Sequence, residues 1–176
     1  MLASLRRSIV ISAIFFVLLG LAYPLAETGI GQALFPAQAS GSLTGDGSAL
    51  VGQSWTGPRW FHGRPDADNP MATGGTNLGP RSKTLVTDVR QEITQLRKEG
   101  ITPTPDLVTS SGSGVDPDIA PADAYAQVNA VARARGLSPA AVRRLVAAHV
   151  AGAQFGFLGS PYINVLQLNQ ALARMS

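Results

Sequence analysis

The sequence has no cysteine and only two histidines, and these absences narrow the chemistry open to it. Without cysteine there is no disulfide framework, no thiol nucleophile and no thiolate metal site. His62 and His149 are not at metal-ligand spacing from each other or from a carboxylate, so no metal site is predicted. The position of His149 one turn after Leu145 fits a packed or partly exposed helix histidine better than a general base.

Charge is also scarce, at 14% of the residues, and it is not concentrated in any basic patch. Arg6 and Arg7 stand before a long apolar run, and from Glu27 onward the chain has twelve basic and eleven acidic residues with no Lys/Arg cluster larger than a pair. Binding to a phosphate backbone needs a basic arm or surface. No nucleic-acid partner is therefore expected.

The longest uncharged run, residues 8–26, is long enough to cross a membrane. As a helix its nineteen residues would cover roughly 28 Å, close to the roughly 30 Å of bilayer hydrocarbon. We predict a single transmembrane helix over 8–26, anchored by apolar residues that include Ile9, Ile14, Phe16 and Leu19.

The charges that flank this run predict its orientation. Arg6 and Arg7 precede it and the first charge after it is Glu27, so residues 1–7 should be cytoplasmic and the rest should lie outside, in a bacterial inner membrane. A cleaved signal peptide is the alternative, because Ala37-Gln38-Ala39 has the small-x-small form of a cleavage site. That triplet lies more than ten residues past a run that is itself longer than the roughly 7–15 residues of a signal core, which favours a retained anchor.

The remainder suits a tether at 27–48 and one α+β domain at 49–176, with helices concentrated in its second half. Up to Pro80 the chain is rich in Gly and Pro, and the apolar islands Leu50-Val51 and Trp60-Phe61 suggest loops with short strands. Four helices are predicted after Pro80. The first has an apolar stripe of Leu85, Val89, Ile93 and Leu96 and ends at Gly100, and the second runs from Pro121 to Arg135. The third starts at Ser138-Pro139, and a closing helix is capped by Asn164. Residues 156–162 read as a strand or turn.

The most unusual segment is 109–118, with three serines, two glycines and two acids in ten residues. It could be a nucleophile loop around Ser113, but the Gly-x-Ser-x-Gly spacing of a nucleophile elbow is absent. A turn in which Asp116 or Asp118 caps the helix near Pro121 is favoured. Trp60-Phe61-His62-Gly63-Arg64-Pro65 fits an interface anchor or a buried aromatic equally well. The stretch 74–80 lacks the lysine of a phosphate loop and fits a tight turn, which could contact a ligand or a partner.

Taken in order, several motifs resemble the C subunit of the Kdp potassium-transporting P-type ATPases, over almost the whole length. They are the N-terminal span, Gly63-Arg64-Pro65, the blocks 74–80 and 111–119, Gln127, residues 131–136 and residues 164–169. The chain departs from that pattern at Asp66, Arg81-Ser82, Asp118 and Ala120, where the family usually has Ser, Asn-Pro, His and Ser.

The resemblance implies an accessory, non-catalytic subunit whose partners are a potassium-channel-like subunit and a P-type ATPase subunit. It would act as a catalytic chaperone that raises the ATP affinity of the ATPase subunit, either by conformational linkage or by touching ATP in a ternary complex; no other cofactor is implied. An anchored hydrolase using Ser113 and His149 is the unrelated alternative. The candidate partner-contacting or functional-loop residues are Arg64, Asn77, Gly79, Ser111, Ser113, Asp116, Asn164 and Asn169.

Overall fold

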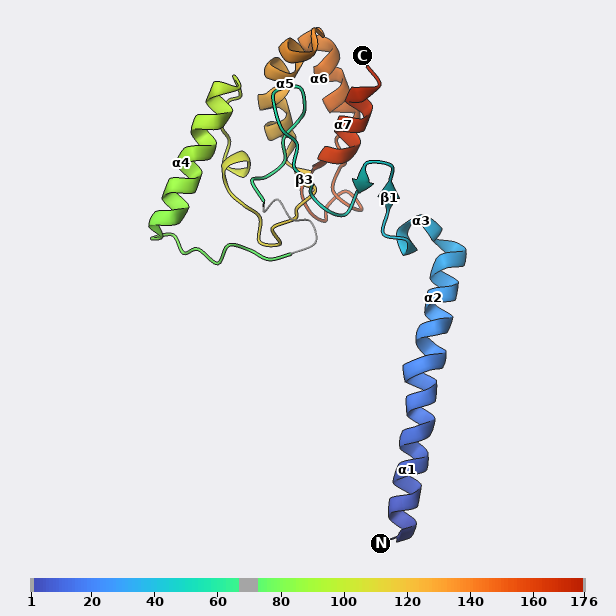
Figure 1. Ribbon diagram of the computed structural model, residues 1–176. Coiled ribbons are helices and arrows are strands. Elements are labelled where there is room, and N and C mark those ends of the chain that lie inside the picture. Colours follow the sequence, from blue (N-terminus) through green and yellow to red (C-terminus); the bar gives the residue numbers. More distant parts are fainter. Residues whose placement is uncertain (1, 67–72, 176) are drawn as a thin grey trace. The chain divides into compact units, whose positions relative to one another are not determined.

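A computed structural model describes residues 2–66 and 73–175, and the chain divides into two compact units (Figure 1). The first unit is Met1–Leu43 and the second is Thr44–Ser176. The first is almost entirely helical, whereas the second holds the buried core, so the two are described in turn.

The first unit is one long apolar helix followed by a short one. Its segments are α1 (Leu2–Val17), a π-helical turn η1 (Leu18–Ala22), α2 (Tyr23–Leu34) and α3 (Pro36–Ala39). The continuous helix Leu2–Leu34 is long and apolar enough to cross a membrane, and none of its residues is buried. It contains the predicted span 8–26 and continues through residues 27–34, which we had expected in the tether.

The wide turn η1 has a local cause in the sequence. Pro24 lacks the N–H that would bond to the carbonyl group of Gly20 in a regular α-helix, and η1 ends one residue before α2 begins at Tyr23. The predicted anchor side chains are all exposed, by 55–69%, as a lipid-facing helix requires: Ile9, Ile14, Phe16 and Leu19.

The second unit confirms the α+β class, with helices concentrated in its second half (Figure 1). Its elements are β1 (Leu43–Thr44, at the unit boundary), β2 (Gly47–Ser48), α4 (Lys83–Lys98), the 3-10 turn η2 (Asp106–Val108), β3 (Asp118–Ile119), α5 (Pro121–Arg135), α6 (Pro139–Ala148), β4 (Ile163–Asn164) and α7 (Val165–Ala173). The strands β3 and β4 pair antiparallel, with Asp118 opposite Asn164 and Ile119 opposite Ile163.

Local signals set the helix ends as predicted. The Ser138 hydroxyl accepts a hydrogen bond from the Ala141 N–H at 3.2 Å, and Asn164 Oδ1 accepts one from the Gln167 N–H at 3.2 Å. The expected cap of α5 by Asp116 or Asp118 is wrong. Asp118 belongs to β3 and Asp116 precedes it, so Ala120 is the N-cap residue of α5. The carboxylate of Asp123 in the first turn accepts the Ala120 N–H, at 3.1 Å.

The main core joins α5, α6, α7 and the β3–β4 pair. Its most buried members are Phe61, Val128, Val131, Val142, Val146, Ile163, Leu168 and Leu172. A smaller cluster of Leu96, Ile101, Leu107 and Ala130 attaches α4 and η2 to the buried side of α5. The predicted apolar stripe of α4 therefore faces the domain, as expected for an amphipathic helix.

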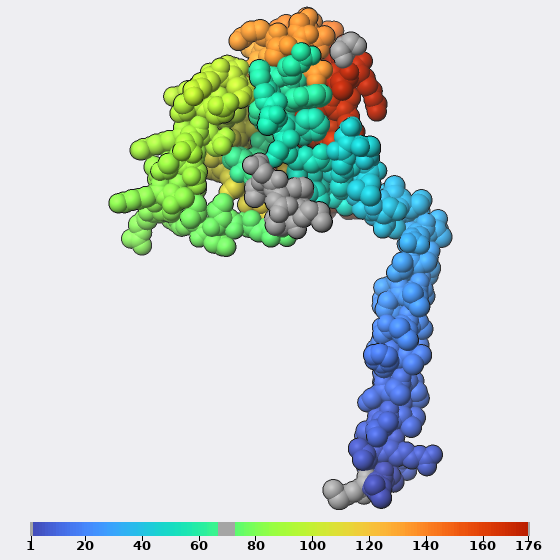
Figure 2. Space-filling view, in the orientation of Figure 1, coloured from blue at the N-terminus to red at the C-terminus, as the bar shows by residue number. Residues whose placement is uncertain are grey.

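The segment that contains the apolar islands Leu50-Val51 and Trp60-Phe61 lies across the surface of the helical layer (teal in Figure 2). Its apolar islands are not strands, contrary to our expectation. The Phe61 N–H donates to Asn169 Oδ1 and the Phe61 carbonyl accepts from Asn169 Nδ2, both at 2.9 Å. His62 is paired in the same way with Gln127, at 2.7 and 3.0 Å. Two side-chain amides from α5 and α7 thus take the place of a neighbouring strand, and Phe61 is a core residue.

Candidate functional site

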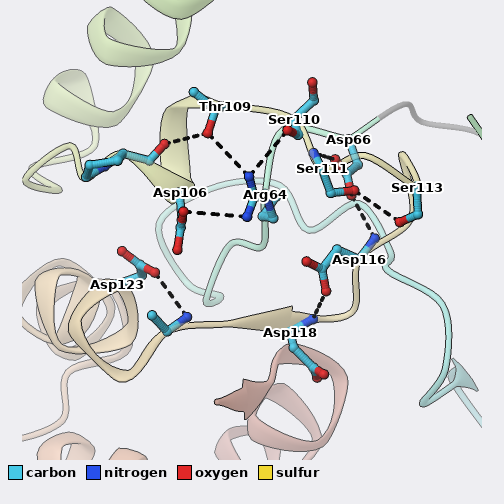
Figure 3. A network of polar contacts seen from close by, with 12 residues as sticks. Arg64, Asp66, Asp106, Thr109, Ser110, Ser111, Ser113, Asp116, Asp118 and Asp123 are labelled. Carbon is cyan, nitrogen blue, oxygen red and sulfur yellow. Dashed lines mark hydrogen bonds and ion pairs between the residues drawn. The ribbon is translucent and has the colours of Figure 1, made fainter. Parts of the chain in front are cut away.

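A carboxylate at the end of the Gly63–Asp66 segment organises the serine-rich loop. Asp66 accepts three hydrogen bonds, from the Ser111 N–H at 2.6 Å, the Ser111 hydroxyl at 2.7 Å and the Asp116 N–H at 2.8 Å (Figure 3). Hydrogen bonds to an ionised acceptor are stronger than neutral ones. One side chain therefore holds both ends of the loop 111–116.

The serines of this loop complete the same network. Ser111, only 8% exposed, accepts the Gly114 N–H at 2.9 Å, and its oxygen lies 3.2 Å from the Ser113 oxygen. Ser113 in turn accepts the Val115 N–H at 3.2 Å. These bonds close a compact turn, which is the role favoured for the segment on sequence grounds.

Nothing in these bonds activates Ser113 as a nucleophile. A nucleophilic serine needs a base within hydrogen-bond reach, but the imidazole of His149 pairs its Nδ1 with the Leu145 carbonyl at 2.8 Å, at the end of α6. In the described ranges 2–66 and 73–175 no hydrogen bond joins Ser113 to a histidine. The geometry gives the hydrolase interpretation no support.

Arg64 ties the same segment to the start of the loop. Its guanidinium lies 3.5 Å from Asp106 Oδ1, 3.4 Å from the Thr109 hydroxyl and 3.3 Å from the Ser110 carbonyl (Figure 3). These contacts are long and the ion pair is partly exposed, so it contributes at most about 1 kcal/mol. The weak contacts of Arg64 position the start of the loop, whereas the three short hydrogen bonds of Asp66 hold its conformation.

Two glycines let the segment that begins at residue 74 approach the loop 111–116 closely. The Gly74 N–H donates to the Ser113 carbonyl at 2.7 Å. Gly114 has φ +70, and a Cβ placed there would collide with the carbonyl oxygen of Gly74. The glycine-rich stretch 74–80 thus begins as a backbone partner of the serine loop, and the approach requires glycine at position 114.

Two acids with raised pKa values, the half-buried Asp118 and the buried Asp123, lie near the network. Burial raises the pKa of Asp118, against the hydrogen bond that Asn164 donates at 2.9 Å, while the charge of Asp116 raises it further. Burial likewise raises the pKa of Asp123, and the nearby carboxylate of Asp106 adds to the shift. Burial is the main cause of both shifts, and the neighbouring carboxylates add to it.

A cavity of about 310 Å³ opens next to Asp66 and Asp116. Its lining carries the carboxylates of Asp66, Glu92 and Asp116 against one arginine, Arg64. Such a balance repels a polyphosphate rather than attracting one. Across the described part of the chain, no group of three or more His, Asp or Glu is arranged to hold a metal ion.

Comparison with known proteins identifies the family. The family described as KdpC, the c chain of a K⁺-transporting ATPase, matches residues 5–174. The chain belongs to the KdpC family. A protein of Sorangium cellulosum named "Potassium-transporting ATPase KdpC subunit" is 50% identical over 98% of both chains. Proteins of the same name from Burkholderia vietnamiensis and Caulobacter vibrioides are 50% and 47% identical, over 96% and 98% of this chain and 94% and 93% of theirs.

In this KdpC-family chain the structure brings together only some of the candidate residues. Arg64, Ser111, Ser113 and Asp116 share the network of Figure 3. Asn164 lies beside the network, where its amide donates a hydrogen bond to Asp118 Oδ1 and another to the Ala49 carbonyl, both at 2.9 Å.

The other candidates lie elsewhere. Asn169 is fully buried and belongs to the core pairing with Phe61. Asn77, at φ +56, and Gly79 are exposed residues of the stretch before α4. Neither joins the network by a hydrogen bond in the part of the chain that the structure describes.

Sequence reasoning missed the residue on which the network depends. Asp66 was noted only as a departure from the KdpC pattern, because a single aspartate after Arg-Pro has no local signature. The unusual concentration of backbone donors in residues 111–116 was a usable signal, since such a turn calls for an anionic acceptor. Gln127, part of the resemblance, was not expected to pair with the His62 backbone.

Proposed function

We propose that this chain is a subunit of a potassium-transporting ATPase and that it raises the ATP affinity of the hydrolysing subunit without touching ATP. The observation that supports the first part is the KdpC-family match over residues 5–174, which takes in both the apolar helix and the domain. The relatives carry the word "subunit" in their names, which agrees with an accessory role.

The membrane topology follows from charge. Arg6 and Arg7 precede the apolar helix, and Glu27 is the first charge after its predicted span, so the N-terminus is cytoplasmic and the domain external, at the inner membrane of a bacterium. Hydrolysis of ATP takes place in the cytoplasm. An external domain therefore acts on nucleotide affinity through the conformations of the pump.

The mechanism is linkage. If the chain binds the ATP-competent conformation of the pump more tightly than the others, it raises the population of that conformation and hence the apparent ATP affinity. The polar groups of the candidate site support this role, because Asp66 and the loop serines satisfy one another instead of presenting a reactive group. The acidic lining of the adjacent cavity also argues against direct ATP contact there.

The test compares the pump complex with and without this chain. Coupling free energies of this kind are about 1–3 kcal/mol, so removal of the chain should raise the half-saturating ATP concentration about 5- to 150-fold. A variant that lacks residues 2–26 should fail to co-purify with the pump. An unchanged ATP dependence with the chain absent would refute the linkage mechanism.

Topology is tested separately with a single cysteine, which the cysteine-free chain makes straightforward. Ser113→Cys should react with an impermeant thiol reagent added outside the cell, because Ser113 is an exposed residue. Ser4→Cys, before Arg6, should react only from the cytoplasmic side. Labelling of Ser113→Cys only from the cytoplasm would overturn the external placement and reopen direct contact with ATP.

A further inference from the structure

The loop between α6 and β4 presents aromatic side chains to solvent. In the segment 151–162, Phe155 is 88% exposed, Phe157 is 81% exposed and Leu158 is 55% exposed. The loop lies at the end of the domain opposite the α5–α6 turn (salmon in Figure 1). Scattered exposed apolar residues are ordinary, but here two nearly bare phenylalanines and a leucine lie within four consecutive residues of one loop tip. Exposed apolar side chains that gather in this way mark interaction sites.

The tip is held in place by backbone hydrogen bonds. Ala151 and Tyr162 exchange bonds of 2.9 and 3.0 Å at the base, and Gln154 and Leu158 exchange two of 2.9 Å near the tip. Between them Phe155 has φ +53, a left-handed conformation that is unusual for a bulky residue. Strain of this kind is retained at binding sites that need a preorganised shape.

The chemistry of the partner follows from charge. The sequence from Val150 to Ala173 contains no Asp, Glu, Lys or Arg. Loops that bind membrane surfaces combine apolar side chains with basic residues and with Trp or Tyr at the headgroup level. The tip of this loop carries phenylalanines without any cation, which fits an uncharged apolar recess on a protein.

We infer that the loop 151–162 is a docking element that inserts Phe155 and Phe157 into an uncharged apolar recess on another subunit of the potassium-transporting ATPase. This inference rests on the proposed function, which supplies the partner. Aromatic side chains that fill a partner's pocket dominate binding energies at interfaces. The loop also continues directly into β4, whose Asn164 contacts Asp118 beside the Asp66 network.

The test measures binding of the full-length chain to the solubilised complex that lacks it. The double variant Phe155→Ser/Phe157→Ser should bind about 30-fold more weakly or worse, the loss expected for aromatic hot spots. Leu50→Ser, at a residue 61% exposed outside the loop, is the matched control and should bind like the unaltered chain. Both phenylalanines lie outside the core, so the variant's urea midpoint should match that of the unaltered chain.

A second measurement separates protein from lipid. An environment-sensitive fluorophore on Leu158→Cys should shift to the blue when the complex is added, and should not shift with vesicles of phosphatidylethanolamine and phosphatidylglycerol alone. A blue shift on vesicles alone would overturn the inference in favour of a membrane contact.

The binding outcomes also distinguish the two proposals. Equal binding by the double variant and the unaltered chain overturns the docking inference and leaves the proposed function intact. An equal loss of binding in Leu50→Ser would also overturn the docking inference, because the loss would then not be specific to the loop 151–162. Failure of the unaltered chain to bind refutes the proposed function itself.

Discussion

Replacing Asn169 by leucine should destabilise the domain by several kilocalories per mole. Asn169 is fully buried and both its amide atoms bond to the backbone of Phe61, at 2.9 Å each. Leucine has a similar volume, so little cavity is left, but the N–H and the carbonyl of Phe61 lose their partners. Each unpaired buried group costs about 1–3 kcal/mol, so the two together give an expected loss of about 2–6 kcal/mol. That is a large part of the roughly 5–15 kcal/mol of a typical domain.

Urea unfolding of the full-length chain in detergent, followed by tryptophan fluorescence, measures this loss. The only two tryptophans, Trp55 and Trp60, pack against the domain core, so the anchor helix contributes no signal. Asn129→Leu makes the same chemical change at an exposed position of α5 and should alter stability by less than about 0.5 kcal/mol. If Asn169→Leu were as mild as this control, the amide pairing would not stabilise the domain and the reasoning would fail.

Three further predictions concern the loop network. Asp66→Ala should lower the free energy of unfolding by about 2–4 kcal/mol, because it removes the acceptor of three hydrogen bonds, two of them from backbone N–H groups. The control is Asp88→Ala, at an exposed position. Amide hydrogen exchange in residues 111–116 should accelerate in Asp66→Ala but not in Asp88→Ala. Gly114→Ala should cost more than about 1 kcal/mol, owing to its positive φ and the collision with Gly74, whereas Gly112→Ala, with open space around it, should be tolerated; urea midpoints decide between them, and equal midpoints would contradict the packing described. Asp118→Asn should stabilise the protein at pH 7. The pKa of Asp118 is raised in the folded state, so the stability linked to its protonated form is lost as pH rises above the ordinary aspartate pKa of about 4. The gain in stability should vanish below that pH, and a gain that persisted there would argue against an ionisation effect.

The parts of the fold that local sequence controls were predictable. The bounds of α5 agree with the predicted Pro121 to Arg135, and Ser138 and Asn164 cap the next two helices as expected. Caps and apolar periodicity act within a few residues, so the sequence displays them directly. The apolar run of residues 8–26 was equally legible, although its helix extends to Leu34.

The candidate site was less predictable because its bonds join distant residues. Asp66 reaches residues 45 and 50 positions later, and Phe61 reaches Asn169 across 108 positions. No periodicity encodes such pairs. The apolar island Trp60-Phe61 has the composition of a strand, but its hydrogen-bonding partners are side chains of helices, a solution that strand patterns do not reveal.

The pairing of Phe61 with Asn169 also has a consequence for how the protein is made. The backbone groups of Phe61 and His62 find side-chain partners in α7 and α5, and α7 spans Val165–Ala173, about a hundred residues further along the chain. Contacts at such separation form late, because a long loop must close before they contribute. This pairing therefore cannot form until α7 has been synthesised, and a chain cut short before α7 leaves the N–H and the carbonyl group of Phe61 without the partners that Asn169 supplies. Folding of the core around Phe61 thus waits for the synthesis of α7.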